Sequence, residues 1–104
     1  WLILVPQRNG VTEIHDLSPL DQTMLTFETV TVSENLKRFT GCRKINVAAL
    51  GNQVSQLHVH VIARFSDDAA WPNPVWGSGR AEPYEGKAAD DFIAAFKAGF
   101  EDRN

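Results

Sequence analysis

Two histidines, His58 and His60, stand two residues apart in a segment that otherwise alternates with Leu and Val. Because side chains of a β-strand point alternately to its two faces, the apolar residues share one face and the histidines share the other. Gln56 and Arg64 continue the polar face at the same spacing, which only Ile62 interrupts. A strand with a purely structural role rarely needs so many polar side chains on one face. The histidine pair is therefore the candidate chemical centre.

Two kinds of chemistry suit a pair of imidazoles on one face. The first is metal binding, in which His58 and His60 are two ligands and further groups complete the site. The only other histidine is His15, and no Asp or Glu lies close in sequence to the pair. The second is nucleophilic catalysis, in which a neutral imidazole nitrogen attacks phosphorus and a hydrogen bond to the other nitrogen fixes the tautomer. Spacing and composition leave both open.

The segments on either side predict the strands that position the histidines. We expect 55–65 to be the strand that carries the pair, and 44–50 to be the strand before it. The short connection, with Gly51 and Asn52, predicts that these two strands form a hairpin. The apolar run 1–5 predicts a further strand, and its unbroken hydrophobicity indicates burial on both faces.

Two helices complete the predicted fold. Ser18 as N-cap, Pro19 at the first helical position and Gly41 as the stop predict a helix that ends near Phe39. The apolar stripe expected on this helix comprises Leu20, Met24 and Phe27, extended by Leu25, Val32, Leu36 and Phe39. A second helix, 87–102, is predicted from aromatic residues four apart, namely Phe92, Phe96 and Phe100. Three strands, two helices and no βαβ alternation predict an α+β fold with an antiparallel sheet.

Composition sets limits on the class of protein. With 104 residues, of which 43% are hydrophobic and 22% charged, the chain is expected to be one soluble domain spanning 1–104. Its 10 basic and 13 acidic residues give a net charge of −3, which argues against a nucleic-acid partner. No apolar run approaches the ~20 residues of a membrane span, and no signal peptide is visible. The lone Cys42 excludes an internal disulfide and fits the reducing cytoplasm.

The segment from Asn46 to Arg64 resembles the signature of the histidine triad (HIT) superfamily, in which three histidines alternate with apolar residues. The resemblance extends over about residues 1 to 80. His58 matches the middle histidine, which is the family's nucleophile, and His60 matches the third. Gln56 stands where the family has its first histidine. A glutamine amide can still donate and accept hydrogen bonds, so the resemblance implies that activity survives.

The same resemblance implies an enzyme similar to the diadenosine polyphosphate hydrolases. A HIT-like homodimer would bind a purine nucleotide and cleave a dinucleoside polyphosphate or nucleoside phosphoramidate at the α-phosphate, through a nucleotidyl-histidine that water resolves. His60 and Gln56 would hydrogen-bond the transferring phosphate, and neither a metal nor a cofactor would be required. The base pocket of such proteins lies largely ahead of the position of Trp1, so we expect the domain to lack its N-terminal segment.

Four further residues are candidates for substrate binding. The resemblance places Asn46 near the ribose or phosphate. Asn52 and Gln53, at the predicted turn, could direct amides at the phosphate or leaving group, although turn formation alone would account for Asn52. Trp71 lies in a proline-rich segment and resembles a tryptophan that reaches the neighbouring subunit's site in some relatives. Arg64 is expected in solvent at the strand end.

Two other functions stay open. A metal-dependent enzyme with His58 and His60 as ligands would lose activity in chelator and bind zinc stoichiometrically. A catalytically silent nucleotide-binding module would bind AMP without forming a covalent adduct. We assign His15 and Cys42 to the structural background.

Overall fold

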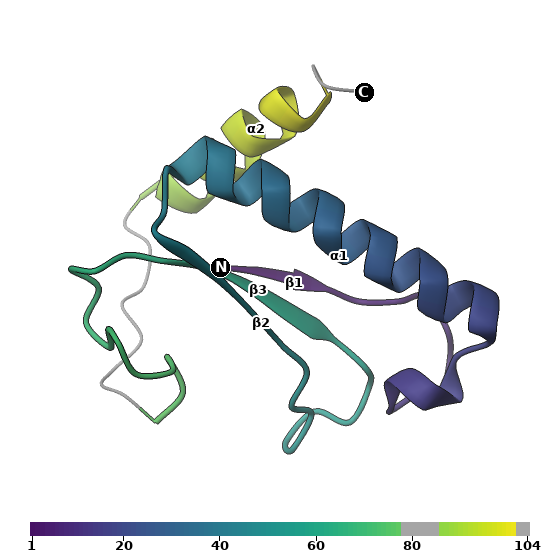
Figure 1. The fold of residues 1–104 in the computed structure, drawn as a ribbon. Helices are drawn as coiled ribbons and strands as arrows, with labels where there is room; N and C mark the ends of the chain where they lie inside the picture. The colour runs from purple at the N-terminus through teal and green to yellow at the C-terminus, as the bar shows by residue number, and fades with distance from the viewer. Residues whose placement is uncertain (78–85, 102–104) are drawn as a thin grey trace.

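The computed structural model describes residues 1–77 and 86–101 of the chain. Figure 1 shows a small sheet with one long helix across it and a second helix against the first. The elements, in chain order, are β1 (Leu2–Leu4), the 3-10 helix η1 (Ile14–Asp16), α1 (Pro19–Thr40), β2 (Lys44–Ala48), β3 (Val59–Arg64) and α2 (Ala88–Glu101). This arrangement confirms the predicted α+β class.

The strand β3 lies in the centre of the sheet, between β1 and β2, and pairs with both in the antiparallel direction. The β2–β3 pair is the predicted hairpin. In this register Ile3 of β1 and Ala48 of β2 both lie opposite His60. The strand begins at Val59, later than predicted, so His58 lies immediately before it. His60 therefore lies within the central strand, and His58 lies just before its first residue.

The long helix α1 has the caps that the sequence predicts. The Ser18 hydroxyl accepts a hydrogen bond from the backbone N–H of Asp21 at 3.1 Å, and Gly41 ends the helix with a left-handed φ of 67°. Threonine hydroxyls along the helix donate to carbonyls four residues earlier, which satisfies these polar groups within the helix itself. These residues are Thr23, Thr26, Thr29, Thr31 and Thr40.

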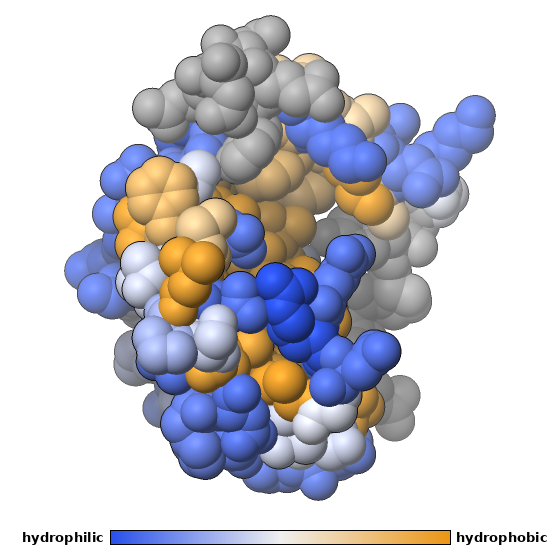
Figure 2. All heavy atoms as spheres, turned by 90° about the vertical axis from the view of Figure 1, so that its right-hand side faces the viewer, coloured by the Kyte–Doolittle hydropathy of each residue, from blue (hydrophilic) through white to orange (hydrophobic). Residues whose placement is uncertain are grey.

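Only one face of the sheet is covered by α1, and the core lies there (Figure 1). A cluster of buried residues joins the helix to the sheet, comprising Leu17, Leu25, Leu57 and Val59. Leu20, Met24 and Phe27, which begin the expected apolar stripe, do not face this core, since they are 70%, 48% and 69% exposed. Viewed from the end where α1 begins, hydrophobic atoms are visible among hydrophilic ones (Figure 2). The helix buries a narrow stripe through Leu25 and Leu36 and leaves its other apolar side in contact with solvent.

The predicted burial of 1–5 on both faces is also wrong. Ile3 and Val5 are 53% and 55% exposed, whereas Leu2 and Leu4 are half-buried. The difference follows from position, because β1 has a strand partner on one side and α1 covers only one of its faces.

The second helix packs against the first through aromatic rings. Phe39 contacts Phe92 and Phe96 edge-on, with ring centroids 5.4 and 5.8 Å apart. The aromatic stripe is thus confirmed for Phe92 and Phe96, whereas the side chain of Phe100 lies outside the described part of the structure. Across residues 1–77 and 86–101, no helix has both the length and the apolar composition that a membrane crossing requires.

Candidate active site

His58 is oriented by a backbone carbonyl. Its Nδ1 lies 2.8 Å from the carbonyl oxygen of Gln56. Since a carbonyl can only accept, Nδ1 must carry the hydrogen, and the lone pair of the neutral ring is then on Nε2. Within the described residues Nε2 has no hydrogen-bond partner. His58 therefore has an available nucleophilic nitrogen.

His60 lies deeper, with 9% of its surface exposed. The indole N–H of Trp1 donates a hydrogen bond of 2.9 Å to its Nδ1. Burial lowers the pKa of His60 below its ordinary value, and the neighbouring His58 lowers it further. The ring centroids of the two histidines are 5.0 Å apart. The neutral form of His60 is therefore favoured in the folded protein.

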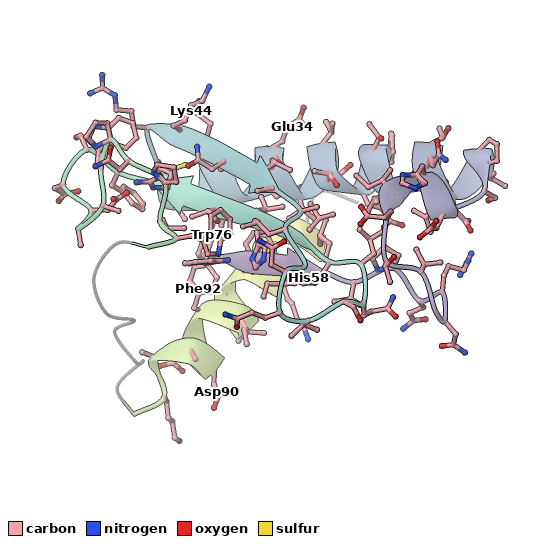
Figure 3. The ribbon with its side chains drawn as sticks, turned by 90° about the horizontal axis from the view of Figure 1, so that it is seen from below. Glu34, Lys44, His58, Trp76, Asp90 and Phe92 are labelled. Carbon is pink, nitrogen blue, oxygen red and sulfur yellow. The ribbon has the colours of Figure 1, made fainter. Side chains whose placement is uncertain are left out.

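A hollow of about 300 Å³ opens beside the histidines. It is lined by His58, His60, Trp76 and further residues of the connection between β2 and β3. From below, His58 and Trp76 lie on the sheet face opposite α1 (Figure 3). We call this hollow and its three aromatic residues the histidine site. The connection contributes Leu50, Gly51, Asn52, Gln53 and Val54, so both predicted amide residues line the hollow.

Gln56 is directed elsewhere. Its side-chain amide donates to the carbonyl oxygen of Arg8 at 3.1 Å, and it is not among the residues that line the hollow. The main chain of Gln56, and not its side chain, therefore makes the contact with His58.

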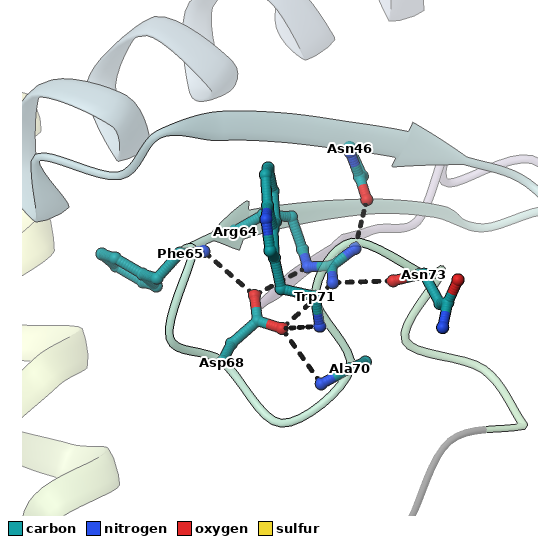
Figure 4. A network of polar contacts seen from close by, with 7 residues as sticks. All are labelled: Asn46, Arg64, Phe65, Asp68, Ala70, Trp71 and Asn73. Atoms are coloured by element: carbon teal, nitrogen blue, oxygen red, sulfur yellow. Dashed lines mark hydrogen bonds and ion pairs between the residues drawn. The ribbon is translucent and has the colours of Figure 1, made fainter.

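Asn46 and Arg64 belong to a second polar cluster, shown in Figure 4. Arg64 is 2% exposed and binds both carboxylate oxygens of Asp68, at 2.9 and 3.0 Å. It also donates at 2.8 Å to the Asn46 side-chain oxygen and to the Asn73 carbonyl. The prediction that Arg64 lies in solvent is wrong, because the loop after β3 folds back to supply acceptors for the guanidinium.

Asp68 and Trp71 complete this cluster, which we call the Arg64 network. Asp68 also accepts hydrogen bonds from the backbone N–H groups of Phe65, Ala70 and Trp71. Arg64, followed by the Phe65 N–H, holds the pKa of Asp68 well below its usual range. The Trp71 ring lies beneath the guanidinium groups of Arg43 and Arg64, at 5.5 and 5.6 Å. Trp71 therefore supports the loop and does not line the histidine site.

Two residues at the histidine site were missed from the sequence, Trp76 and Trp1. Trp76 packs edge-on against His60, with ring centroids 4.9 Å apart. It lies in the same proline-rich segment as Trp71, and of these two tryptophans it is Trp76 that lines the hollow. No local sequence pattern predicts the contact of Trp1 with His60, because the contact depends on which strand pairs with β3.

Among the described residues, no group of three or more His, Cys, Asp or Glu side chains lies close enough together to hold a metal ion. The histidine pair thus lacks a third ligand of these types within residues 1–77 and 86–101.

These features define a small α+β protein with a histidine-based site on the open face of its sheet. A family model described as the HIT domain matches residues 1–67. The chain therefore belongs to the HIT family, which confirms the resemblance seen in the sequence. Membership places it in a superfamily of nucleotide-binding hydrolases and transferases. A comparison with curated proteins finds no significant match.

Solved structures of HIT proteins share the whole described fold. A histidine triad protein from Sinorhizobium meliloti 1021 is 55% identical, with a TM-score of 0.89 over 93% of this chain and 72% of that one. One from Bradyrhizobium japonicum is 46% identical, with a TM-score of 0.90 over 94% and 73%. One from Marinobacter aquaeolei VT8 is 42% identical, with a TM-score of 0.89 over 96% and 73%.

Proposed function

We propose that this protein cleaves a dinucleoside polyphosphate or nucleoside phosphoramidate at its α-phosphate, through a covalent nucleotidyl-His58 intermediate. The observation that supports this most strongly is the hydrogen bond from His58 Nδ1 to the Gln56 carbonyl. It leaves the Nε2 lone pair without a hydrogen-bond partner among the described residues, beside a hollow that can receive a phosphate. A purine nucleotide and a homodimer, which the family resemblance implies, are part of the same proposal. So is a cytoplasmic location, which the lone Cys42 fits.

In the first step, Nε2 of His58 attacks the α-phosphorus. A P–N bond forms while the bond from phosphorus to the leaving group breaks. A leaving phosphate departs as its anion, and a leaving amine takes up a proton from water. The imidazole becomes positively charged, and the Gln56 carbonyl that accepts from Nδ1 stabilises that charge. In the second step, water attacks the same phosphorus and releases His58 with the nucleoside monophosphate.

The other groups of the histidine site position the phosphate. His60 donates a hydrogen bond to a phosphate oxygen, and the amides of Asn52 and Gln53 reach the phosphate or the leaving group. The ring of Trp76 supplies an apolar wall for the nucleotide. Asn46 is not assigned a contact with the phosphate, because its side-chain oxygen already accepts from Arg64.

The test is capture of the intermediate. The protein is mixed with diadenosine tetraphosphate or adenosine phosphoramidate, denatured at alkaline pH, and its intact mass measured. We expect an added adenylyl group on the peptide that contains His58, and no adduct in His58→Ala. His15→Ala is the matched control, since the side chain of His15 is 82% exposed, and it should still form the adduct.

Two outcomes would overturn the proposal. The first is turnover retained in His58→Ala. The second is activity that is lost in chelator and restored by zinc, which would favour metal-dependent catalysis. Binding of AMP with neither turnover nor adduct would identify a silent nucleotide-binding module.

A further inference from the structure

The two histidines of the site face opposite kinds of hydrogen-bond partner at the same ring atom. Nδ1 of His58 lies against a carbonyl oxygen, which can only accept. Nδ1 of His60 lies against the indole N–H of Trp1, which can only donate. A neutral imidazole has one hydrogen-bearing nitrogen and one bare nitrogen. His58 is therefore bare at Nε2, whereas His60 is bare at Nδ1 and carries its hydrogen on Nε2.

Trp1 is placed for this contact by the register of the sheet. Ile3 lies directly opposite His60, and Trp1 stands two residues earlier on the same face. The indole also packs edge-on against His60 and Trp76, with ring centroids 5.7 and 5.5 Å away. The three rings support one another, and the N–H of Trp1 has a defined direction.

We propose that Trp1 is a positioning residue that holds His60 in the tautomer with hydrogen on Nε2, so that His60 donates to the phosphate while His58 attacks. The inference rests on the proposed function and assigns a role to a residue outside the triad positions. Trp1 acts through His60 and need not touch the substrate.

The chemistry of indole makes this role specific. If His60 took up a proton on Nδ1, two N–H groups would point at each other and the hydrogen bond would be lost. Trp1 thus opposes both the other neutral tautomer and the protonated ring. Burial of His60 lowers its pKa in the same direction. A residue with an acceptor at this position would lack this selectivity.

The test measures the tautomer directly. Long-range 1H–15N correlation spectra distinguish bare from hydrogen-bearing nitrogens, and the three histidines are assigned with His15→Ala and His58→Ala. In the unmodified protein we expect His60 to be bare at Nδ1. In Trp1→Phe, which keeps an aromatic ring and removes the N–H, we expect a mixture of tautomers. The loss of one hydrogen bond should then lower kcat about fivefold.

Trp76→Phe is the matched control. Trp76 also packs on His60, at 4.9 Å, but donates no hydrogen bond to it. This variant should leave the His60 tautomer unchanged, whatever it does to the affinity for nucleotide.

The proposal is overturned if the unmodified protein carries hydrogen on His60 Nδ1, a result that needs no variant to fold. It is also overturned if Trp1→Phe keeps the tautomer of the parent. A failure of the proposed function looks different: no adduct would form on His58, while the His60 tautomer could still be read from the spectrum.

Discussion

The two ends of the polar face of β3 behave in opposite ways. At one end, Arg64 is buried and makes four hydrogen bonds, two of them to a single carboxylate. At the other end, the Nε2 atoms of His58 and His60 have no hydrogen-bond partner among the described residues, and a hollow opens beside them.

We propose that this contrast distinguishes a structural polar cluster from a reactive one. The protein itself satisfies the Arg64 guanidinium, so little capacity remains to bind a phosphate. At the histidines the protein satisfies one nitrogen of each ring, and the second nitrogen has no hydrogen-bond partner among the described residues. Five predictions test the contrast.

The largest expected effect is on catalysis. His58→Ala should lower kcat by at least about a thousandfold, because it removes the nucleophile. The melting temperature should change little, since the Nε2 of His58 has no hydrogen-bond partner within the described fold. Steady-state kinetics and thermal unfolding of the same preparation measure both. A His58→Ala variant with a much lower melting temperature but an unchanged kcat would reverse the proposed roles of the two ends.

Substitution at the Arg64 end should instead lower the melting temperature. Arg64→Met should lower the melting temperature on the order of 10 °C, because Asp68, Asn46 and the Asn73 carbonyl lose a common donor. Differential scanning calorimetry measures the shift. Arg43→Met is the control, since Arg43 is exposed and shares only the stacking on Trp71. Equal shifts in the two variants would mean that the hydrogen bonds of Arg64 contribute little.

Substitution of the two tryptophans of the proline-rich segment should likewise affect different properties, KM for Trp76 and the melting temperature for Trp71. Trp76→Ala should raise KM about tenfold, because an aromatic wall of the hollow is lost. Trp71→Ala should lower the melting temperature and change KM much less, since its ring stacks on Arg43 and Arg64. Comparable KM changes in both variants would contradict the separation.

Acid should destabilise the two ends in different pH ranges. The pKa of His60 is lowered by folding, so its contribution to stability is full above its ordinary value of about 6.5 and is lost as the pH falls through the lowered value. The pKa of Asp68 is also lowered, so its contribution is full above about 4 and is lost in stronger acid.

Melting temperatures between pH 8 and 3 measure this dependence. His60→Gln should flatten the curve just below pH 6.5, and Asp68→Asn should flatten it only below about pH 4. A His60→Gln curve that parallels that of the parent through the upper range would contradict the assignment.

The smallest effect is expected at Gln56. Gln56→Ala should change kcat by no more than about threefold, because the backbone carbonyl that orients His58 is retained. The lost side-chain contact is a single hydrogen bond to the Arg8 carbonyl. A large fall in kcat would show that the glutamine amide itself reaches the phosphate, as the family resemblance implied.

Local chemistry in the sequence was sufficient to predict most elements. Ser18, Pro19 and Gly41 predicted the bounds of α1 to within a residue, because caps act through neighbouring backbone groups. The alternation around His58 and His60 predicted the central strand and the motif of the HIT family. The glycine and asparagine of the β2–β3 connection predicted the turn that carries Asn52 and Gln53 to the site.

Sequence patterns did not predict the contacts between segments that are distant along the chain. The burial of Arg64 depends on a loop that returns to supply acceptors, and the exposure of Ile3 depends on the position of β1 within the sheet. The partner of His60 is 59 residues away along the chain, at Trp1. A pattern of residue types records which groups are available at each position. Only the folded chain brings those groups within hydrogen-bond distance, and that pairing distinguishes the histidines that we propose are reactive from the arginine on the same face.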